Sequence, residues 1–562
     1  MPRIPFNGDF YTSKSKLANA QRTVNWFTES DPTGKNKLIA YPTPGLTLKA
    51  TIGNGPIRGM MRFIDTTAGN AEMLYVVSGT EVYKVSTAWG ATLLGTIINS
   101  SADPVSIANN GHLAPGQEAI FVDGTKGYRH LNATSTWVSD ITTNDSTNFP
   151  DGATHVVFFD GLFLANDVTG ATSNQSGAFM WSDSYTASVW QALNFATAER
   201  SPDSLLAISA VNKIIYLFGE FTTELWYNAS GSDATTPFKP QTTIGVGIKA
   251  PHTIARTGDS LIWLSTDENG MARVTIATGN QTKAVSTYAL ENEWNSYSDL
   301  SDAYAFIYEQ DGHTFYELTF PTGDRTFVYD LLQNSWHERE SYNGGAGGKH
   351  KVRHSAFFNG LTIVGDDSSG KLYAYDTDVH QDNAVQIVRQ RDTQHISSDT
   401  NVSVRHNRLT MEFESGVGSA EVSSTNTTNV TGQVADTTAP FVAGDVGKTI
   451  YNTITNESST IAAYITGALV SLTDSNMVMT NGDTYVMGVD PQVELYWSDD
   501  RGAVWKGPIY RTLGLSGDTI KKVSFANLGI SKDRIYRIKG SDNANYTLVG
   551  AYLDVMGGSD ES

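Results

Sequence analysis

The chain has 562 residues, too many for one compact core, so we expect roughly two to four domains or one large repetitive domain with additions. It contains no cysteine, which excludes disulfides, zinc–thiolate sites, iron–sulfur clusters and cysteine nucleophiles. The formal net charge of -20 argues against a protein that grips nucleic acid through clustered Lys and Arg, but not against one that DNA merely passes.

The residue usage predicts an all-β chain. Charged residues make up only 17%, whereas glycine occurs 51 times and aromatic residues make up 10%. Surface helices need many Glu, Lys, Ala and Leu, while aromatic and β-branched residues favour strands and glycine favours turns.

Residues 1–55 are predicted to form an N-terminal arm that contributes to a platform. This segment is punctuated by Lys and Pro and shows no regular apolar period. No apolar run follows Arg3, so no signal peptide is expected, and no stretch of the chain approaches the ~18 apolar residues of a membrane span. We therefore expect a protein that is made in a cytoplasm and has no membrane span.

Residues 56–383 are predicted to form a β-propeller of six or seven blades. Short apolar runs break at a glycine and resume, at intervals of about 47 residues, which is the period of a propeller blade. Glycine is expected at the hairpins because tight two-residue turns need positive φ. Evenly spaced short strands are also typical of a pair of β-sandwiches. The central glycines are Gly79, Gly124, Gly161, Gly219, Gly270, Gly323 and Gly360.

The rest of the chain divides into three parts by amino-acid composition. Residues 384–418 carry long alternating strands, and residues 490–562 resume that pattern, so we expect the two pieces to pair as one platform β-sandwich. Residues 419–489 between them are rich in Thr, Ser, Asn and Val and poor in aromatic rings. We interpret this segment as a small inserted β-domain.

Several short sequence patterns resemble catalytic motifs but lack the residues that the chemistry requires. The string Gly-Asp-Ser-Leu at Ser260 lacks the downstream Asp-x-x-His pair of a hydrolase and opens an apolar strand, so it indicates a strand-entry turn. The glycine-rich run before Lys349 departs from a phosphate loop at two required positions. The histidines are scattered without metal-ligand spacing. We expect no enzyme, no cofactor, and no catalytic or metal-binding residues.

One sharper motif is an Asp box. Ser498, Asp500, Gly502 and Trp505 fit the pattern S-x-D-x-G-x-x-W. In such a hairpin we expect Asp500 to accept turn amides, Gly502 to supply the unusual backbone angle and Trp505 to pack beneath. Asp boxes recur in sialidase-type propellers, which makes a glycan-binding or sialidase-like propeller the alternative function. The box itself is a structural brace, and a kelch-type interaction module is a further alternative.

An ordered set of landmarks runs along most of the chain. It begins with Val24-Asn25 and Pro44-Gly45 and ends with LTMEFESGVG and LYWSDDRGAVW. Its centre comprises Phe195 to Glu199, Pro202, Asp203, Phe218, Gly219, Thr223 and Glu224. In this order the landmarks resemble the packaged-DNA stabilisation family, the tail hub or nozzle proteins of short-tailed bacteriophages. The 419–489 segment departs from the shorter members of that family.

The resemblance implies a virion structural protein, made in the cytoplasm of a bacterial host and located in the virion tail. Six copies would form a ring below the portal and connector, which would continue the DNA channel and retain the packaged DNA. The implied partners are a head-to-tail connector or adaptor protein, a tail fibre or tailspike, and a tail needle or plug. Double-stranded DNA would pass through the channel without specific binding.

Overall fold

The computed structural model describes residues 3–31, 33, 37–112, 116–168, 177–198, 200, 203–229, 237–397, 402–518 and 521–557. The prediction of an all-β chain is confirmed. Within these residues the α-helices are α1 (Ile141–Asn144) and α2 (Tyr288–Trp294), and the 3-10 helices are η1 (Pro251–Thr253) and η2 (Ala443–Asp445). No helix among them has the length and apolar character that crossing a membrane requires.

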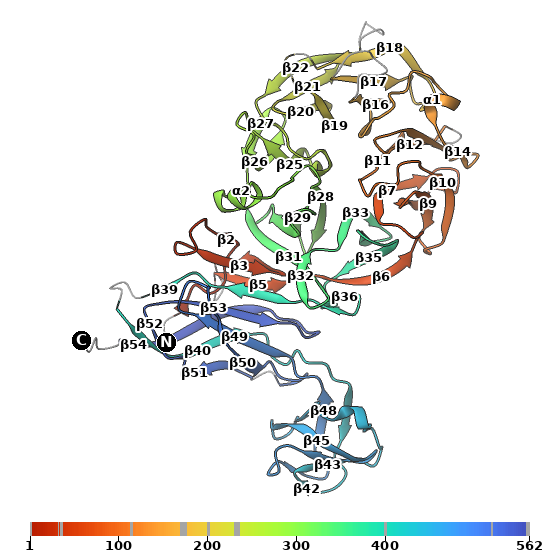
Figure 1. Ribbon diagram of the computed structural model, residues 1–562. Helices are drawn as coiled ribbons and strands as arrows, with labels where there is room; N and C mark the ends of the chain where they lie inside the picture. Colours follow the sequence, from red (N-terminus) through yellow and green to blue (C-terminus); the bar gives the residue numbers. More distant parts are fainter. Residues whose placement is uncertain are drawn as a thin grey trace.

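Seven successive sheets form a closed circle over the described part of residues 45–376, which we call the propeller region (Figure 1). The first strand of most sheets contacts the first strand of the next, and β33 contacts β7, which closes the circle. The strands of the first four sheets are β7 (Ile57–Asp65), β8 (Ala71–Ser78), β9 (Glu81–Ser86) and β10 (Ala91–Thr96); β11 (Ser106–Asn109), β12 (Glu118–Val122), β13 (Gly127–Leu131) and β14 (Thr136–Val138); β15 (Val156–Phe159), β16 (Leu162–Asp167), β17 (Ala178–Ser182) and β18 (Trp190–Thr197); and β19 (Leu205–Val211), β20 (Ile214–Gly219), β21 (Thr223–Asn228) and β22 (Phe238–Ile244). Those of the last three are β23 (Gly247–Ile248), β24 (Ala255–Thr257), β25 (Ser260–Thr266), β26 (Ala272–Thr278) and β27 (Gln281–Ala284); β28 (Tyr304–Gln310), β29 (His313–Phe320), β30 (Arg325–Asp330) and β31 (Ser335–Asn343); and β33 (Val352–Phe358), β34 (Leu361–Asp366) and β35 (Lys371–Asp376) with β6 (Gly45–Thr51).

The central strands of these sheets are apolar on both faces because each sheet lies between two others. In β8, Leu74 and Val76 pack into a cluster shared with the β33–β35 sheet. The alternate residues Tyr75 and Val77 pack into a cluster shared with the β11–β14 sheet. A strand covered on both sides reads as a continuous apolar run, which is why LYVV at 74–77 shows no polar alternation.

The circle is closed by a strand from the N-terminal segment. β6 pairs antiparallel with β35, with Gly45 opposite Asp376 and Thr51 opposite Lys371. Residues 45–51 therefore belong to a propeller sheet, although the sequence placed them in the arm. The β33–β35 sheet has three strands of its own, and β6 supplies the fourth from more than 300 residues away, a pairing that no local pattern reveals.

The predicted role of the repeat glycines holds for five of the seven. Gly79, Gly124, Gly161, Gly270 and Gly360 have φ between 57° and 86°. Gly219 and Gly323 are not among the positive-φ glycines, so a turn requirement does not explain them. Both allow a close approach instead: a Cβ would come within 2.4 Å of the Asp203 carboxylate at Gly219 and within 2.6 Å of the Tyr297 ring at Gly323.

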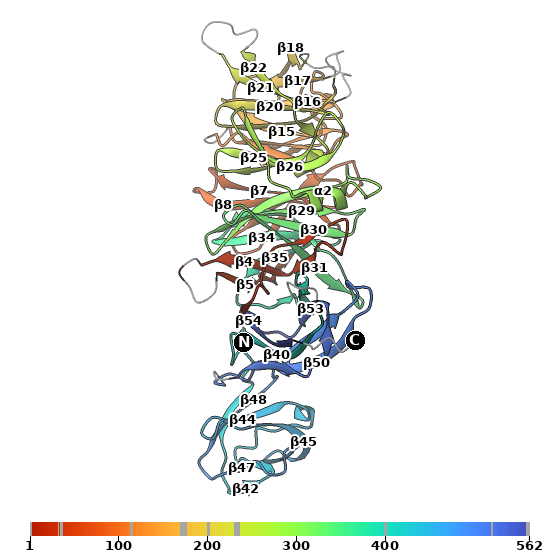
Figure 2. The ribbon, with the colours of Figure 1, turned by 90° about the vertical axis from the view of Figure 1, so that its left-hand side faces the viewer.

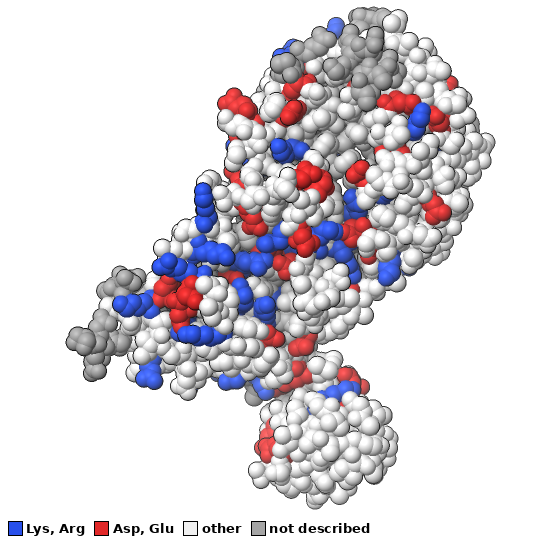
Figure 3. Space-filling model, in the orientation of Figure 1, with Lys and Arg blue, Asp and Glu red and all other residues white. Residues whose placement is uncertain are grey.

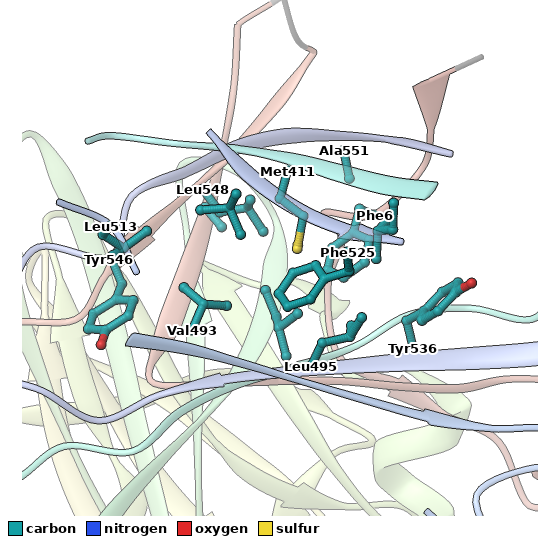
Figure 4. Packing of buried hydrophobic residues seen from close by; sticks show 14 of the residues in the cluster. Phe6, Met411, Val493, Leu495, Leu513, Phe525, Tyr536, Tyr546, Leu548 and Ala551 are labelled. Carbon is teal, nitrogen blue, oxygen red and sulfur yellow. The ribbon is translucent and has the colours of Figure 1, made fainter. Parts of the chain in front are cut away.

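Two sheets below the propeller region, which we call the platform, share one core (Figures 1 and 4). The first contains β4 (Trp26–Ser30), β5 (Leu38–Pro42), β54 (Leu548–Gly557), β40 (Val404–Phe413) and β51 (Val523–Ala526), with β1 (Arg3–Ile4) and β52 (Ile530–Ser531). The second contains β3 (Ala20–Val24), β38 (Arg389–Asp392), β53 (Asp533–Gly540), β49 (Gln492–Ser498) and β50 (Lys506–Thr512), with β2 (Tyr11–Thr12) and β39 (Ile396–Ser397). Met411, Phe525 and Leu548 from the first sheet meet Val493, Leu495 and Tyr536 from the second.

Shorter strands attach to the edges of these sheets. β32 (Ala346–Lys349) forms a hairpin with β31, while β36 (Gln381–Asp382) and β37 (Val385–Gln386) extend the sheet of β6 toward the platform. Both ends of the chain thus contribute strands to the platform, as Figure 1 shows by the position of the termini.

Residues 422–488 form a separate unit at the far end of the platform (Figures 1 and 2). Its core, which includes Val434, Phe441, Ile450 and Val470, draws only on residues of this segment. The chain enters and leaves side by side, since the Glu421 amide donates to the Met487 carbonyl at 2.9 Å. The strands are β41 (Val422–Thr425), β42 (Val430–Thr431), β43 (Gln433–Ala435), β44 (Thr449–Asn452), β45 (Ser458–Thr466), β46 (Leu469–Leu472), β47 (Val478–Met479) and β48 (Thr484–Gly488).

Candidate functional site at the junction of the propeller region and the platform

One sheet runs without interruption from the propeller region into the platform. β31, the last strand of the β28–β31 sheet, pairs in parallel with β3 through Val24 and Glu338. β3 in turn pairs with β38, which pairs with β53. The propeller region and the platform are therefore joined by backbone hydrogen bonds, and we call the surroundings of β3 the junction.

Asn25 lies at the end of β3 and binds both sides of the junction. Its side-chain Oδ1 accepts from the Glu340 amide, and Nδ2 donates to the Glu340 carbonyl, each at 3.0 Å. Nδ2 also donates to the Val388 carbonyl at 2.9 Å. The backbone of Asn25 has φ 56°, which asparagine tolerates better than most residues.

A buried ionic network surrounds Glu338. Arg22 donates to both of its carboxylate oxygens, at 2.8 and 2.7 Å, and Arg325 donates to Oε2. The Glu338 side chain is fully buried, and burial alone would raise its pKa, but Arg22 and Arg325 hold that pKa below its usual value. Arg22 also pairs with Glu340 at 3.0 Å, so one arginine of β3 binds two carboxylates of β31.

Arg391 of β38 fixes the N-terminal segment against the platform. Its guanidinium is buried and donates to the carbonyls of Phe6 and Asp9 and to the Thr23 hydroxyl, at 2.8, 3.1 and 2.7 Å. Burial lowers the pKa of Arg391 to about 10, which leaves it charged at neutral pH. The Cα of Gly8 lies close enough that a Cβ there would be 2.7 Å from Nη2.

Beside this network lies a groove of about 300 Å³, which we call the basic groove. Its carboxylates, Glu293 and Asp392, are engaged by Arg325 and Arg537. The cationic side chains that line it are Lys16, Arg22, Arg325, Arg501 and Arg537. Figure 3 shows Lys and Arg gathered along the junction on this face, whereas residues 422–488 below are mostly uncharged.

Two residues of the Asp box, Gly502 and Trp505, line the basic groove together with Arg501, in the turn between β49 and β50. The Ser498 hydroxyl donates to Asp500 Oδ1 at 2.6 Å, and the Val504 amide donates to the same oxygen at 2.8 Å. Gly502 has φ 83°, and its amide donates to Ser498 Oγ at 2.8 Å. Bonds from Ser498 and the Val504 amide hold the pKa of Asp500 below its usual value.

Trp505 is only half-buried, whereas the motif led us to expect a ring packed beneath the hairpin. Its ring lies against Arg537, whose guanidinium carbon is 3.7 Å from the ring centroid. Arg537 in turn binds Asp392 of β38 with two hydrogen bonds of 2.7 Å. The hairpin is therefore braced against the platform through a cation, and Arg501 and Val504 at its tip remain exposed.

A second groove of about 300 Å³, the acidic groove, lies at the same junction. It is lined by the carboxylates of Glu29, Asp311 and Glu414 and by the aromatic rings of Phe27 and Tyr41, and no Lys or Arg is among its described lining residues. Burial and then the charges of Glu29, Asp31 and Glu414 raise the pKa of Tyr41, which reflects the local negative potential.

His313 forms part of the floor of the acidic groove. Its side chain is about 95% buried, and Nδ1 lies 2.6 Å from Asp330 Oδ2. The Asp330 carboxylate accepts from Nδ1 and thereby fixes the orientation of the ring. The three carboxylates of the acidic groove favour a guest that donates hydrogen bonds and carries positive charge.

Strands on opposite sides of the molecule supply the lining of the two grooves. In Figure 2, β30 and β53, which supply lining residues to the basic groove, lie toward the right-hand side, and β4 and β5, which supply lining residues to the acidic groove, lie toward the left. The molecule therefore has a positively charged groove on one side of the junction and a negatively charged groove on the other.

The other sequence patterns lie in turns, a hairpin and a ring-stacking contact. Ser260 begins β25 after a turn with Gly258 at φ 52°, as predicted, and its Oγ lies 2.5 Å from Thr278 Oγ1. Lys349 ends the β31–β32 hairpin and pairs with Asp367. His155 and His252 stack with ring centroids 5.1 Å apart. Over the described ranges, no three His, Asp or Glu side chains are grouped to hold a metal ion.

The central landmarks brace the β19–β22 sheet. Asp203 Oδ2 accepts from the amides of Phe221 and Thr222, both at 2.9 Å, and thereby closes the β20–β21 turn. Glu224 accepts from the Trp226 indole at 2.9 Å, and the Thr223 hydroxyl donates to the Val246 carbonyl at 2.7 Å. Glu199 and Pro202 lie outside the described residues.

Sequence reasoning missed the residues of the junction. Arg22, Glu338 and Arg391 are charged residues within strands. Arg22 binds Glu338 at a separation of 316 positions and Arg391 binds the Phe6 carbonyl at a separation of 385, which hides these contacts from sequence reasoning. A local signal exists in β38, where Arg389, Arg391 and Asp392 make a strand that is mostly charged and yet buried. Buried charges need partners, so such a strand indicates an ionic network.

Comparison with known proteins places most of the chain in one family. Residues 2–380 match the model of a family described as "Bacteriophage P22 Gp10, beta-propeller". No curated protein matches the chain.

Proposed function

The chain belongs to the bacteriophage P22 Gp10 family of phage stabilisation proteins, and from this membership we propose that it forms a ring of six subunits in the virion tail. The ring would lie below the portal and connector, continue the DNA channel, retain the packaged DNA and anchor tail fibres or tailspikes. The family match over residues 2–380 is the main observation in support of this proposal. The family is one of phage structural proteins with a β-propeller.

We further propose that the seven sheets of the propeller region are seven blades. Each of the first six has at least four strands of its own, and β6 supplies the fourth strand of the last. Closure by a strand from the N-terminal side ties the two ends of the circle together, so that unrolling it requires breaking the β6–β35 pairing.

The domain organisation that we propose follows the observed sheets. Residues 1–44 and the parts 384–418 and 490–562 form the platform, residues 45–383 form the propeller, and residues 419–489 form an inserted domain. The self-contained core of 422–488 and the shared core of the platform support this division.

The charge of the chain suits a channel wall that DNA passes. With 59 acidic and 39 basic side chains, the chain repels phosphate overall, so DNA would slide without being held. Partners would be a connector or adaptor protein, a tail fibre or tailspike and a tail needle or plug, because a tail ring joins the head to the host-binding parts.

Loss of the protein from the phage that encodes it tests the role in DNA retention. Capsids assembled without it should fill with DNA and then release it, so that the genome becomes sensitive to nuclease. Adding the purified protein to freshly filled capsids should restore protection. Full nuclease resistance in its absence would refute the role.

A further inference from the structure

The two oppositely charged grooves raise the question of what each one binds. Both lie at the junction, lined by strands on opposite sides of the molecule, and each has a volume of about 300 Å³. In a ring with rotational symmetry, the front of each subunit contacts the back of the next. Each subunit therefore needs two different and complementary surfaces.

We propose that the tip of the Asp-box hairpin of one subunit inserts into the acidic groove of the next subunit. The partner is thus a second copy of this chain, and Arg501 and Val504 are the side chains that enter. The inference rests on the proposed ring and specifies the contact that closes it.

The charge of the acidic groove matches the hairpin tip. Arg501 is exposed at the turn, and the groove offers Glu29, Asp311 and Glu414 with no described lysine or arginine to neutralise them. A guanidinium donates in several directions at once, which suits a groove lined by several acceptors.

The apolar parts match as well. Val504 at the tip is 62% exposed, which is high for a side chain of this kind in a hairpin that is otherwise fixed. The acidic groove presents Phe27, Tyr41 and Pro42 beside its carboxylates. An apolar side chain next to a cation would therefore find an aromatic wall next to its anionic partners.

The Asp box gives the tip the rigidity that such a contact needs. Ser498 and Asp500 bind the amides of Gly502 and Val504, and Trp505 is held by Arg537. A tip that is already ordered loses little conformational entropy on binding. The proposal gives this motif of the platform a function in subunit contact.

Disulfide crosslinking between two variants tests the contact directly, because the natural chain has no cysteine. Val504→Cys places a thiol at the tip, and Thr377→Cys places one at the exposed rim of the acidic groove. A mixture of the two full-length variants under mild oxidation should give a covalent dimer. The matched control pairs Thr377→Cys with Leu193→Cys, which is 74% exposed on β18 far from the junction.

Charge reversal gives a second, independent readout. Arg501→Glu should raise the concentration needed for half-assembly about tenfold, and so should Glu414→Arg, whereas the two changes in one chain should restore assembly. Lys283→Glu makes the same charge change on exposed β27 and should leave assembly unaltered. Arg501 is exposed, so its replacement leaves the folded core intact.

The outcomes separate this contact from the proposed function. Rings seen by electron microscopy without a 504–377 crosslink would overturn the contact and leave the tail ring standing. Absence of both rings and crosslinks would overturn both. Equal crosslinking of the control pair would show random collision and would also overturn the contact.

Discussion

The side-chain amide of Asn25 pairs with the backbone of Glu340 as a neighbouring strand would, accepting from its amide and donating to its carbonyl at 3.0 Å each. Asn25 thereby continues the hydrogen bonding between β3 and β31 beyond the point where the backbones separate. A third bond, to the Val388 carbonyl, includes the segment before β38. One short side chain thus holds three segments of the junction together.

Replacing Asn25 should therefore destabilise the junction. We predict that Asn25→Ala lowers the free energy of unfolding by about 3 kcal/mol, because buried backbone groups lose their partners. Asn70→Ala is the matched control: Asn70 also has positive φ, but it is exposed, so its replacement should cost about 1 kcal/mol of backbone strain. Urea unfolding followed by tryptophan fluorescence measures both, and equal losses would contradict the bridging role.

The ionic network makes a second prediction. Glu338→Gln removes the charge that Arg22 and Arg325 share and leaves two guanidinium groups facing a neutral amide. The free energy of unfolding should fall by about 3–5 kcal/mol. Glu268→Gln, an exposed control, should change it by less than about 0.5 kcal/mol. If the two variants melt at the same temperature, the network does not stabilise the junction.

Two buried histidines predict sensitivity to acid. His130 lies against Tyr75, and His406 lies between Ser531 and Tyr536. Burial and then nearby cations lower the pKa of each to about 4. Between about pH 6.5 and 4 these histidines therefore bind protons in the unfolded chain but not in the folded chain. The contribution to stability is complete above pH 6.5 and is lost as the pH falls through this window.

Each of these histidines should contribute up to about 3 kcal/mol to the loss. Melting temperatures measured between pH 7.5 and 4 should stay level above pH 6.5 and fall below it. The variant His130→Asn retains an acceptor for Tyr75 but does not titrate here, so its decline should be shallower. A flat profile for the natural protein down to pH 4.5 would contradict this account.

The segment 419–488 should be removable. Its core uses only its own residues, and a Cβ on Gly418 would lie 2.9 Å from the Val489 carbonyl oxygen, so the ends of the deletion nearly touch. Chains lacking 419–488 should stay soluble and keep a cooperative melt. Deletion of 106–153, which removes a sheet of the propeller region, is the control and should abolish folding. An insoluble product from the first deletion would refute the independence of the segment.

Local sequence patterns predicted much of the fold. The repeat glycines marked the sheets because a tight hairpin requires positive φ at Gly79 and Gly360 whatever surrounds it. The polar composition of 419–489 predicted an inserted domain there, because a small core needs few aromatic rings. The landmarks Val24-Asn25 and Pro44-Gly45 indicated the family, and they lie at the junction and at the start of β6.

What escaped prediction depends on contacts between distant segments. β6 joins β35 across the whole propeller region, and nothing in 45–51 specifies that partner. The pairing of Arg22 with Glu338 is equally remote, since a charged residue in a strand normally faces water. The Asp-box pattern specified the turn at Ser498 and Asp500, but it could not show that Trp505 would rest on Arg537 at the edge of a groove.

Electron microscopy of the purified full-length protein, alone and mixed with the cognate portal–connector complex, tests the central claim most directly. We predict six-fold rings with an open axial channel that stack on the connector, with the junction of each subunit against that of the next. Single subunits that form no ring at any concentration and never bind the connector would contradict the assignment of a ring in the virion tail.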